Sequence, residues 1–133
     1  MKRTVTLSLA LLFLVLALAG CGKYVSSYSA VMHVRHNDSD SAWTSFHEYR
    51  GTDVFTLKFG GETAKIRYTG TLETGSLTVY YDRGDAKEVL FTAKAGEEID
   101  ACSEPFSAET VYVILETDET CKDGNFSFEI VRD

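Results

Sequence analysis

One short segment carries three side chains suited to holding a ligand. Within 42–49, Trp43, Ser45, His47 and Tyr49 share one parity, and three of them (Trp43, His47 and Tyr49) carry rings. Phe46 has the opposite parity, so if this segment is a strand and Phe46 faces the core, the other three form an exposed aromatic strip. Exposed aromatic rings offer flat apolar area with a polar handle, which suits sugar rings or a protein partner. These residues are our first candidates for a binding site.

Two further interpretations of the aromatic residues are open. A second strip would include Tyr80, provided that its neighbour Tyr81 faces the core. Alternatively, Trp43 itself lies in the core, where large aromatic side chains commonly pack. Sequence alternation does not decide between an exposed and a buried Trp43.

Catalytic and metal chemistry have weaker support in the sequence. His33 and His36 are three residues apart, so on a strand they point to opposite faces and do not share one metal ion. No Gly-x-Ser-x-Gly motif is present, and the acid pairs at 97–98 and 118–119 are adjacent, so on strands they diverge. We therefore expect a chain that is not an enzyme, with no metal site and no cofactor; a hydrolase is the less favoured alternative.

Calcium is a separate alternative. The segments 37–40 (Asn-Asp-Ser-Asp) and 82–85 (Asp-Arg-Gly-Asp) place hard oxygen ligands in expected turns. Neither has the spacing of an EF-hand, and turns select Asp, Asn and Gly for backbone reasons alone. The sequence leaves calcium binding open.

Two cysteines beyond the leader, Cys102 and Cys121, form an even pair in a small domain. In an oxidising compartment such a pair predicts a disulfide, worth roughly 3 kcal/mol for a loop of this length. The alternative is two buried free thiols. A metal site is disfavoured, because neither cysteine has a Cys-x-x-Cys or Cys-x-x-His spacing.

The first residues have the pattern of a secretory signal peptide. Lys2 and Arg3 precede a mostly apolar 16-residue run over 4–19. The sequence Leu18-Ala19-Gly20-Cys21 follows, and it closely resembles the lipobox of bacterial lipoproteins. That resemblance implies cleavage after residue 20, diacylglycerol on the Cys21 sulfur, and anchoring to the extracytoplasmic face of a cell membrane. The alternative, a transmembrane helix, is disfavoured because the run is near the short limit for about 30 Å of hydrocarbon.

These boundaries divide the 133 residues into three parts. Residues 1–20 are the expected signal peptide, 21–27 the lipidated cysteine with a short tether, and 28–133 a single domain. The loss of Lys2 and Arg3 takes the formal net charge of −7 to −9. Such an acidic domain repels phosphate backbones, so we expect no nucleic-acid partner.

The remainder of the chain alternates between apolar and polar residues with period two. In 64–72, for example, the apolar residues share one parity and Lys65, Arg67, Thr69 and Thr71 share the other. Turn signals separate such runs every 10–15 residues or so, the spacing of an all-β antiparallel sandwich. The segment 86–93 also fits a short helix, but a strand after the 82–85 turn completes a hairpin.

We therefore predict an all-β, antiparallel two-sheet sandwich, jelly-roll-like, with eight or nine strands. The expected strands are about 28–36, 42–49, 53–59, 63–72, 76–82, 87–93, 97–101, 110–117 and 125–131. The expected core consists of Phe55, Leu57, Phe59, Ile66, Tyr68, Leu77, Val79, Phe91, Val113, Leu115, Phe126 and Phe128.

The paired-strand patterns at 72–84 and at 111–130 resemble those of small jelly-roll lipoproteins and of some carbohydrate-binding and pre-peptidase-type sandwich modules. Such sandwiches share no common activity, so the resemblance concerns the fold. The expected function is a membrane-anchored, non-catalytic binding module, with a glycan or an envelope protein as partner. A structural or assembly subunit of an envelope complex is the alternative.

Overall fold

Long, alternating strands dominate the computed structural model, which describes residues 24–84 and 86–132. Over these residues the chain forms strands and connecting turns, with no helix. The strands are β1 (Ser27–Val31), β2 (Val34–Asn37), β3 (Ser41–Lys58), β4 (Thr63–Thr74), β5 (Ser76–Asp82), β6 (Lys87–Lys94), β7 (Glu98–Cys102), β8 (Phe106–Ser107) and β9 (Thr110–Val131). The predicted all-β antiparallel fold is confirmed.

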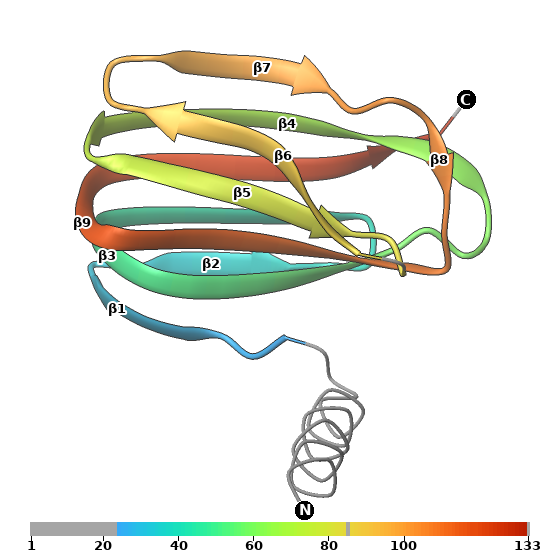
Figure 1. Ribbon diagram of the computed structural model, residues 1–133, viewed down its shortest axis with the longest axis horizontal. Helices are drawn as coiled ribbons and strands as arrows, with labels where there is room; N and C mark the ends of the chain where they lie inside the picture. The colour runs from blue at the N-terminus through green and yellow to red at the C-terminus, as the bar shows by residue number, and fades with distance from the viewer. Residues whose placement is uncertain (1–23, 85, 133) are drawn as a thin grey trace, which may run out of the picture.

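The two layers of the sandwich are one folded sheet (Figure 1). The central strands β3 and β9 pair along almost their whole length and bend together, so each contributes one half to either layer. The back layer joins β2, the first half of β3, the second half of β9, β4 and β7. The front layer joins the other halves of β3 and β9 to β5 and β6.

The bend in β3 lies at Gly51, where the register with β9 shifts. Gly51 has φ of 120°, and a Cβ there would collide with the backbone of Ser27 and Tyr28 in β1. We predicted two strands, 42–49 and 53–59, with a turn between them; the structure has one strand, which bends at Gly51. Similarly, 110–117 and 125–131 belong to one strand, because Asp123 takes φ of 52° within the ladder and does not end it.

Two other predictions concern smaller elements. The expected strand 28–36 is divided into β1 and β2 by Met32, which has φ of 50°. The ambiguous segment 86–93 is the strand β6, which pairs with β5 as a hairpin. The prediction of a strand is therefore correct, and the helical alternative is wrong.

The core lies between the layers, and the predicted core residues are found there. All twelve are either buried or packed against the buried cluster. Tyr68 of β4 and Phe91 of β6 stack across the layers, with ring centroids 4.6 Å apart. The predicted core did not include other members of the cluster, among them Phe46, Tyr49, Leu72, Phe106 and Cys121.

The predicted disulfide between Cys102 and Cys121 is wrong: both cysteines are free. Cys102 lies opposite Arg67 of β4, which in turn lies opposite Glu129 of β9. Cys121 comes eight residues before Glu129 in β9, so the two cysteines are offset by roughly 26 Å along the strand direction, too far for a disulfide. Cys121 is buried and its Sγ donates to the Ser76 carbonyl at 3.3 Å, whereas Cys102 is exposed on β7.

The expected signal peptide 1–20 and the lipidation site Cys21 lie outside the described residues. The described part of the expected tether is packed against the domain. The Tyr24 hydroxyl donates to Asp82 at 2.6 Å, and the Ser26 hydroxyl donates to Asp53 at 3.1 Å. Burial and Asp82 raise the pKa of Tyr24 to about 12, so this hydroxyl remains a donor. In the described part of the chain, no helix is long and apolar enough to cross a membrane.

Candidate functional site

Trp43 points outward from the back layer. In the first half of β3 the even-numbered residues Ala42, Thr44 and Phe46 face the core, so Trp43 faces solvent and is 39% exposed. Its ring stacks on His36 of β2, the residue directly opposite, with centroids 5.9 Å apart and planes 21° apart. The alternative in which Trp43 belongs to the core is excluded.

The strand register places hydroxyl groups beside Trp43. Ser127 of β9 lies opposite Trp43, and Thr69 of β4 lies opposite Ser127. The two hydroxyls are 2.7 Å apart and hydrogen-bonded. Asp100 of β7 continues this row beyond Thr69, and Asn125 lies in the neighbouring row. One aromatic ring therefore borders a floor of short polar side chains.

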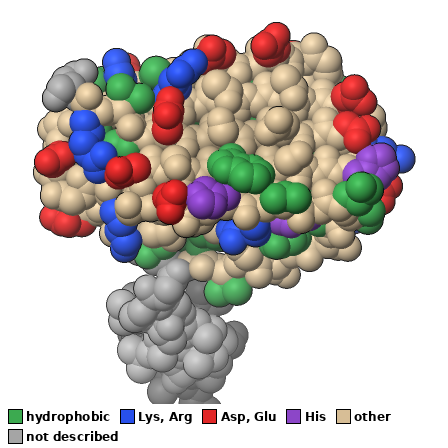
Figure 2. Space-filling model, turned by 180° about the vertical axis from the view of Figure 1, so that it is seen from behind, with side chains coloured by type: hydrophobic (Ala, Val, Ile, Leu, Met, Phe, Trp, Pro, Cys, Tyr) green, Lys and Arg blue, Asp and Glu red, His purple; other side chains and the backbone are tan. Residues whose placement is uncertain are grey.

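The floor is hollowed into two shallow depressions, with volumes of about 330 Å³ and 290 Å³. The first is lined by Trp43 and Arg67, among others, and the second by Asn125 and Asp100. Because Thr69 and Ser127 line both, the two form one groove across β3, β9, β4 and β7. Figure 2 shows the molecule from behind: hydrophobic side chains lie beside a histidine, with an acidic side chain next to the histidine and an area of uncharged atoms above them.

Arg67 is the only Lys or Arg among the described residues that line the groove, and its charge is compensated. Its guanidinium lies 3.4 Å from Asp100 and 3.4 Å from Glu129. All three side chains are about half exposed or more, so these ion pairs orient side chains and contribute little stability. The groove therefore has no unpaired cation to offer an anionic ligand.

His47 and Tyr49, predicted to join Trp43 in one strip, are not brought together with it. His47 is exposed on the same face, but it lies about 13 Å along β3 and forms a 2.8 Å ion-pair contact with Asp123. Tyr49 is buried, and its hydroxyl donates to the Leu115 carbonyl at 2.8 Å. The expectation of an exposed Tyr49 is wrong, because β3 changes its inward parity between Phe46 and Tyr49, next to the bend.

Tyr80 lies on the other layer. As predicted, it points outward while Tyr81 packs against the core. The Lys87 ammonium lies 4.3 Å from the Tyr80 ring centroid, and Tyr80 borders a separate depression with Thr52, Thr78 and Glu116. Tyr80 therefore cannot act together with Trp43 on one small ligand.

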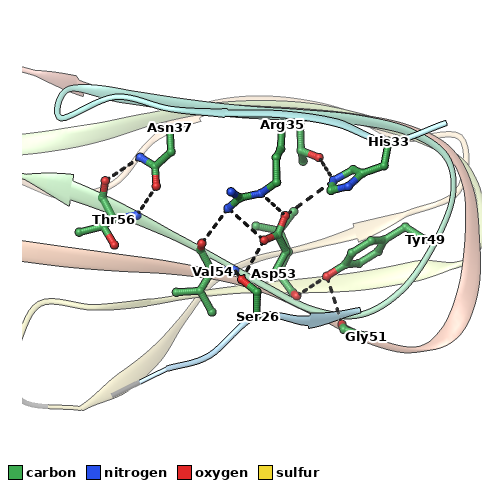
Figure 3. Close-up of polar contacts among 11 residues, drawn as sticks. Ser26, His33, Arg35, Asn37, Tyr49, Gly51, Asp53, Val54 and Thr56 are labelled. Carbon is green, nitrogen blue, oxygen red and sulfur yellow. Dashed lines mark hydrogen bonds and ion pairs between the residues drawn. The ribbon is translucent and has the colours of Figure 1, made fainter. Parts of the chain in front are cut away.

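A serine and a histidine lie close to the buried Asp53, in a polar cluster at the edge of the sandwich formed by β1 and β2 (Figure 3). Asp53 is fully buried and accepts from Ser26, while His33 Nε2 lies 3.8 Å from Asp53 and 2.9 Å from the Thr44 hydroxyl. In a catalytic triad the histidine stands between the serine and the carboxylate. Here Ser26 donates directly to Asp53 and accepts from the Val54 N–H, while His33 contacts the Thr44 hydroxyl, so the order of a catalytic triad is not formed. The Ser26 hydroxyl and the Arg35 guanidinium hydrogen-bond the buried carboxylate of Asp53, which is a structural role.

The other histidine and turn carboxylates have protein partners. His36 bonds Asp38 at 2.8 Å, and Asp40 bonds Arg132 at 3.1 Å. Asp82 accepts from Tyr24 and from the Gly84 N–H. Among the described residues, no group of three or more His, Cys, Asp or Glu side chains is arranged to hold a metal ion. Asp85, the last residue of the second candidate calcium turn, lies outside the description.

Sequence reasoning missed His36, Thr69, Asn125 and Ser127 as neighbours of Trp43. That Thr69 and Ser127 face solvent could be predicted, since both alternate with apolar residues. The pairing order β2, β3, β9, β4 could not be predicted, because β9, which lies between β3 and β4, is distant from both in sequence. Only the register brings their side chains into one row.

No family model matches the chain. No curated protein matches it either. Among solved structures, the chain is similar to the pre-peptidase C-terminal domain of collagenase from Bacillus anthracis, with 15% sequence identity and a TM-score of 0.45. The similarity covers 80% of this chain and 90% of that chain. The chemistry of the site has to be understood from this chain's own residues.

Proposed function

We propose that this protein is a lipid-anchored, extracytoplasmic binding module that presents the back-layer groove beside Trp43 to its ligand. One observation carries the proposal: Trp43 is 39% exposed and held in place by His36, at the edge of a polar groove. An exposed indole is a common anchor of binding sites, because it buries large apolar area at small entropic cost. Ser26 donates to Asp53 and has no contact with His33 as its base, so these residues do not form a catalytic triad, which favours binding over hydrolysis.

The anchor rests on the leader. The lipobox Leu18-Ala19-Gly20-Cys21 supports lipidation of Cys21, and two acyl chains suffice for stable anchoring. Intact-mass spectrometry of protein from native membranes tests this part. We expect a chain that begins at Cys21 and carries diacylglycerol; a chain that begins at Met1 without lipid contradicts the proposal.

Binding is tested with the full lipidated chain in phospholipid nanodiscs, mixed with cell-envelope fragments of the producing organism and sedimented. Trp43→Ala should weaken binding by roughly tenfold or more. His47→Ala is the matched control, since it removes an exposed ring from the same face outside the groove, and it should bind like the wild type. Equal binding by Trp43→Ala and wild type would refute the role of the groove, provided that thermal unfolding shows both variants folded.

A second candidate function is an assembly subunit, favoured by apolar side chains around the β1–β2 turn. Val31, Met32 and Val34 are 45%, 80% and 56% exposed. Exposed apolar side chains that lie together mark protein contacts. In this case Met32→Ser with Val34→Ser should abolish co-purification of a specific partner after crosslinking in intact cells, whereas Trp43→Ala should not. Retention of the partner by the double variant would exclude this surface.

A further inference from the structure

We infer that the groove beside Trp43 binds a neutral glycan that lies extended across the strands, with one sugar ring on the Trp43 indole. This inference rests on the proposed binding function and specifies its ligand class. Three properties of the groove support this inference. The Trp43 ring is already oriented, the floor carries uncharged hydrogen-bonding groups, and the positive charge of Arg67 is paired with carboxylates.

The first property is the fixed Trp43 ring. His36 stacks on the indole at 5.9 Å and 21°, and the His36 imidazole is itself held by Asp38 at 2.8 Å. The indole is therefore oriented before a ligand arrives, so binding costs little side-chain entropy. A pyranose presents a flat face of C–H groups, which matches the apolar face of an aromatic ring.

The second property is the chemistry of the floor. Ser127 and Thr69 carry hydroxyls, and Asn125 carries an amide; each of these groups can donate and accept. Sugar hydroxyls also donate and accept, so such side chains can satisfy them in either direction. The row from Trp43 to Asp100 crosses three strand intervals, or about 14 Å. A groove of that length fits an oligosaccharide better than a single sugar.

The third property is charge. Arg67 is flanked by Asp100 and Glu129, and Glu98 also lines the groove. Together with the acidic character of the whole chain, this surface repels a polymer that carries phosphate or carboxylate groups. A neutral ligand binds without separating these ion pairs or bringing like charges together.

The backbone of the floor argues against an extended peptide as ligand. The part of β9 in the floor is paired with β3 on one side and β4 on the other, and β4 is paired with β9 and β7. Its N–H and C=O groups are already used, so strand addition, the common mode for extended peptides, is blocked on this face. Recognition here must use side chains.

The experiment uses the only tryptophan of the chain as its own reporter. The full lipidated chain in phospholipid nanodiscs is titrated with neutral tetrasaccharides (β-1,4-linked N-acetylglucosamine, β-1,4-linked glucose, α-1,6-linked mannose) and with polygalacturonate. We expect a saturable change in Trp43 emission with at least one neutral tetrasaccharide. Its dissociation constant should change by less than about twofold between about 50 mM and 500 mM salt. Binding of polygalacturonate alone would overturn the inference.

Two variants test whether the ligand binds in the groove. Thr69→Val with Ser127→Ala removes both floor hydroxyls without touching the reporter and should weaken sugar binding by roughly tenfold. Thr78→Val is the matched control on the front layer and should have no effect. If the floor variant, folded by thermal unfolding, binds the sugar as tightly as the wild type, the groove is not the site and the inference fails.

Two treatments of the envelope fragments separate this inference from the proposed function. A mixture of glycosidases that hydrolyses β-1,4-linked N-acetylglucosamine, β-1,4-linked glucose and α-1,6-linked mannose should abolish Trp43-dependent sedimentation, while protease treatment should leave it intact. Sedimentation that depends on Trp43 but is lost only after protease treatment would refute a glycan ligand. The proposed binding function would then stand, with a protein as the ligand. Absence of any sedimentation with untreated fragments would refute both.

Discussion

Arg35 and Asp53 join the two layers of the sandwich at the edge formed by β2, where the Arg35 side chain is 34% exposed and that of Asp53 is buried. Arg35 lies on β2 in the back layer and Asp53 on the half of β3 in the front layer. The Arg35 Nε and Nη2 atoms lie 3.2 Å and 3.1 Å from the two carboxylate oxygens of Asp53, and the guanidinium lies 4.5 Å from the Phe55 ring centroid. A forked contact of this kind fixes both distance and orientation. It secures β2, and through β2 the His36 ring that supports Trp43.

Loss of the Asp53 carboxylate should therefore destabilise the domain. Asp53→Ala leaves Arg35 and Ser26 without their shared acceptor and should lower the free energy of unfolding by about 3 kcal/mol. Asp38→Ala removes an exposed carboxylate from an ion pair and should cost less than about 1 kcal/mol. Urea unfolding measures both; equal, small losses would contradict the structural role of Asp53.

Stability should fall as the pH drops below neutrality. Burial lowers the pKa of His33 below its usual value, with Asp53 opposing and Arg35 assisting the shift. The unfolded chain then binds a proton more readily than the folded chain. The free energy of unfolding should therefore decrease as the pH falls below about 6.5. His33→Asn should reduce the difference in stability between about pH 7.5 and pH 5. An unchanged difference would show that His33 does not contribute.

The two cysteines should react very differently. A maleimide should label Cys102 in the native protein, whereas Cys121 should react only after unfolding, because burial shields it and raises the pKa of its thiol. Reducing agent should leave the melting temperature unchanged. Cys102→Ser is the control and should remove native labelling. A mass lower by two hydrogens, restored by reduction, would instead demonstrate a disulfide.

Gly70 should not tolerate a side chain. It faces the core from β4, and a Cβ there would collide with the Phe126 ring. Gly70→Ala should lower the free energy of unfolding by about 1 to 3 kcal/mol through overpacking, although alanine normally stabilises a strand relative to glycine. Thr71→Ala, at the exposed neighbouring position, should have a smaller effect in the same denaturation assay. A more stable Gly70→Ala variant would contradict the packing.

The segment that leads toward the proposed anchor should loosen without its hydrogen bond. Tyr24→Phe removes the donor to Asp82 while keeping the ring that contacts Tyr112 at 5.6 Å. Hydrogen exchange at 24–26 should become faster, since the remaining contacts hold this segment less firmly. Tyr80→Phe, on the same layer, should leave this exchange unchanged. Unaltered exchange in Tyr24→Phe would show that Ser26 alone holds the segment.

Local pattern was sufficient for the class of fold and for most of the core. Alternation with period two placed Phe55, Leu57, Ile66 and Phe128 inside, because burial on one face of a strand requires that period. The outward direction of Tyr80 followed in the same way. The resemblance of residues 18–21 to a lipobox is also a purely local signal, and lipidation of Cys21 stays a prediction.

Non-local geometry decided what local pattern could not. The bend at Gly51 depends on close approach to β1, and with it Tyr49 turns inward although alternation from Trp43 predicts the opposite. The separation of Cys102 from Cys121 depends on strand order, not on their spacing in the sequence. The groove depends on register between strands far apart in the chain. Such pairings are selected by the packing of the whole sandwich, so only the tertiary structure determines them.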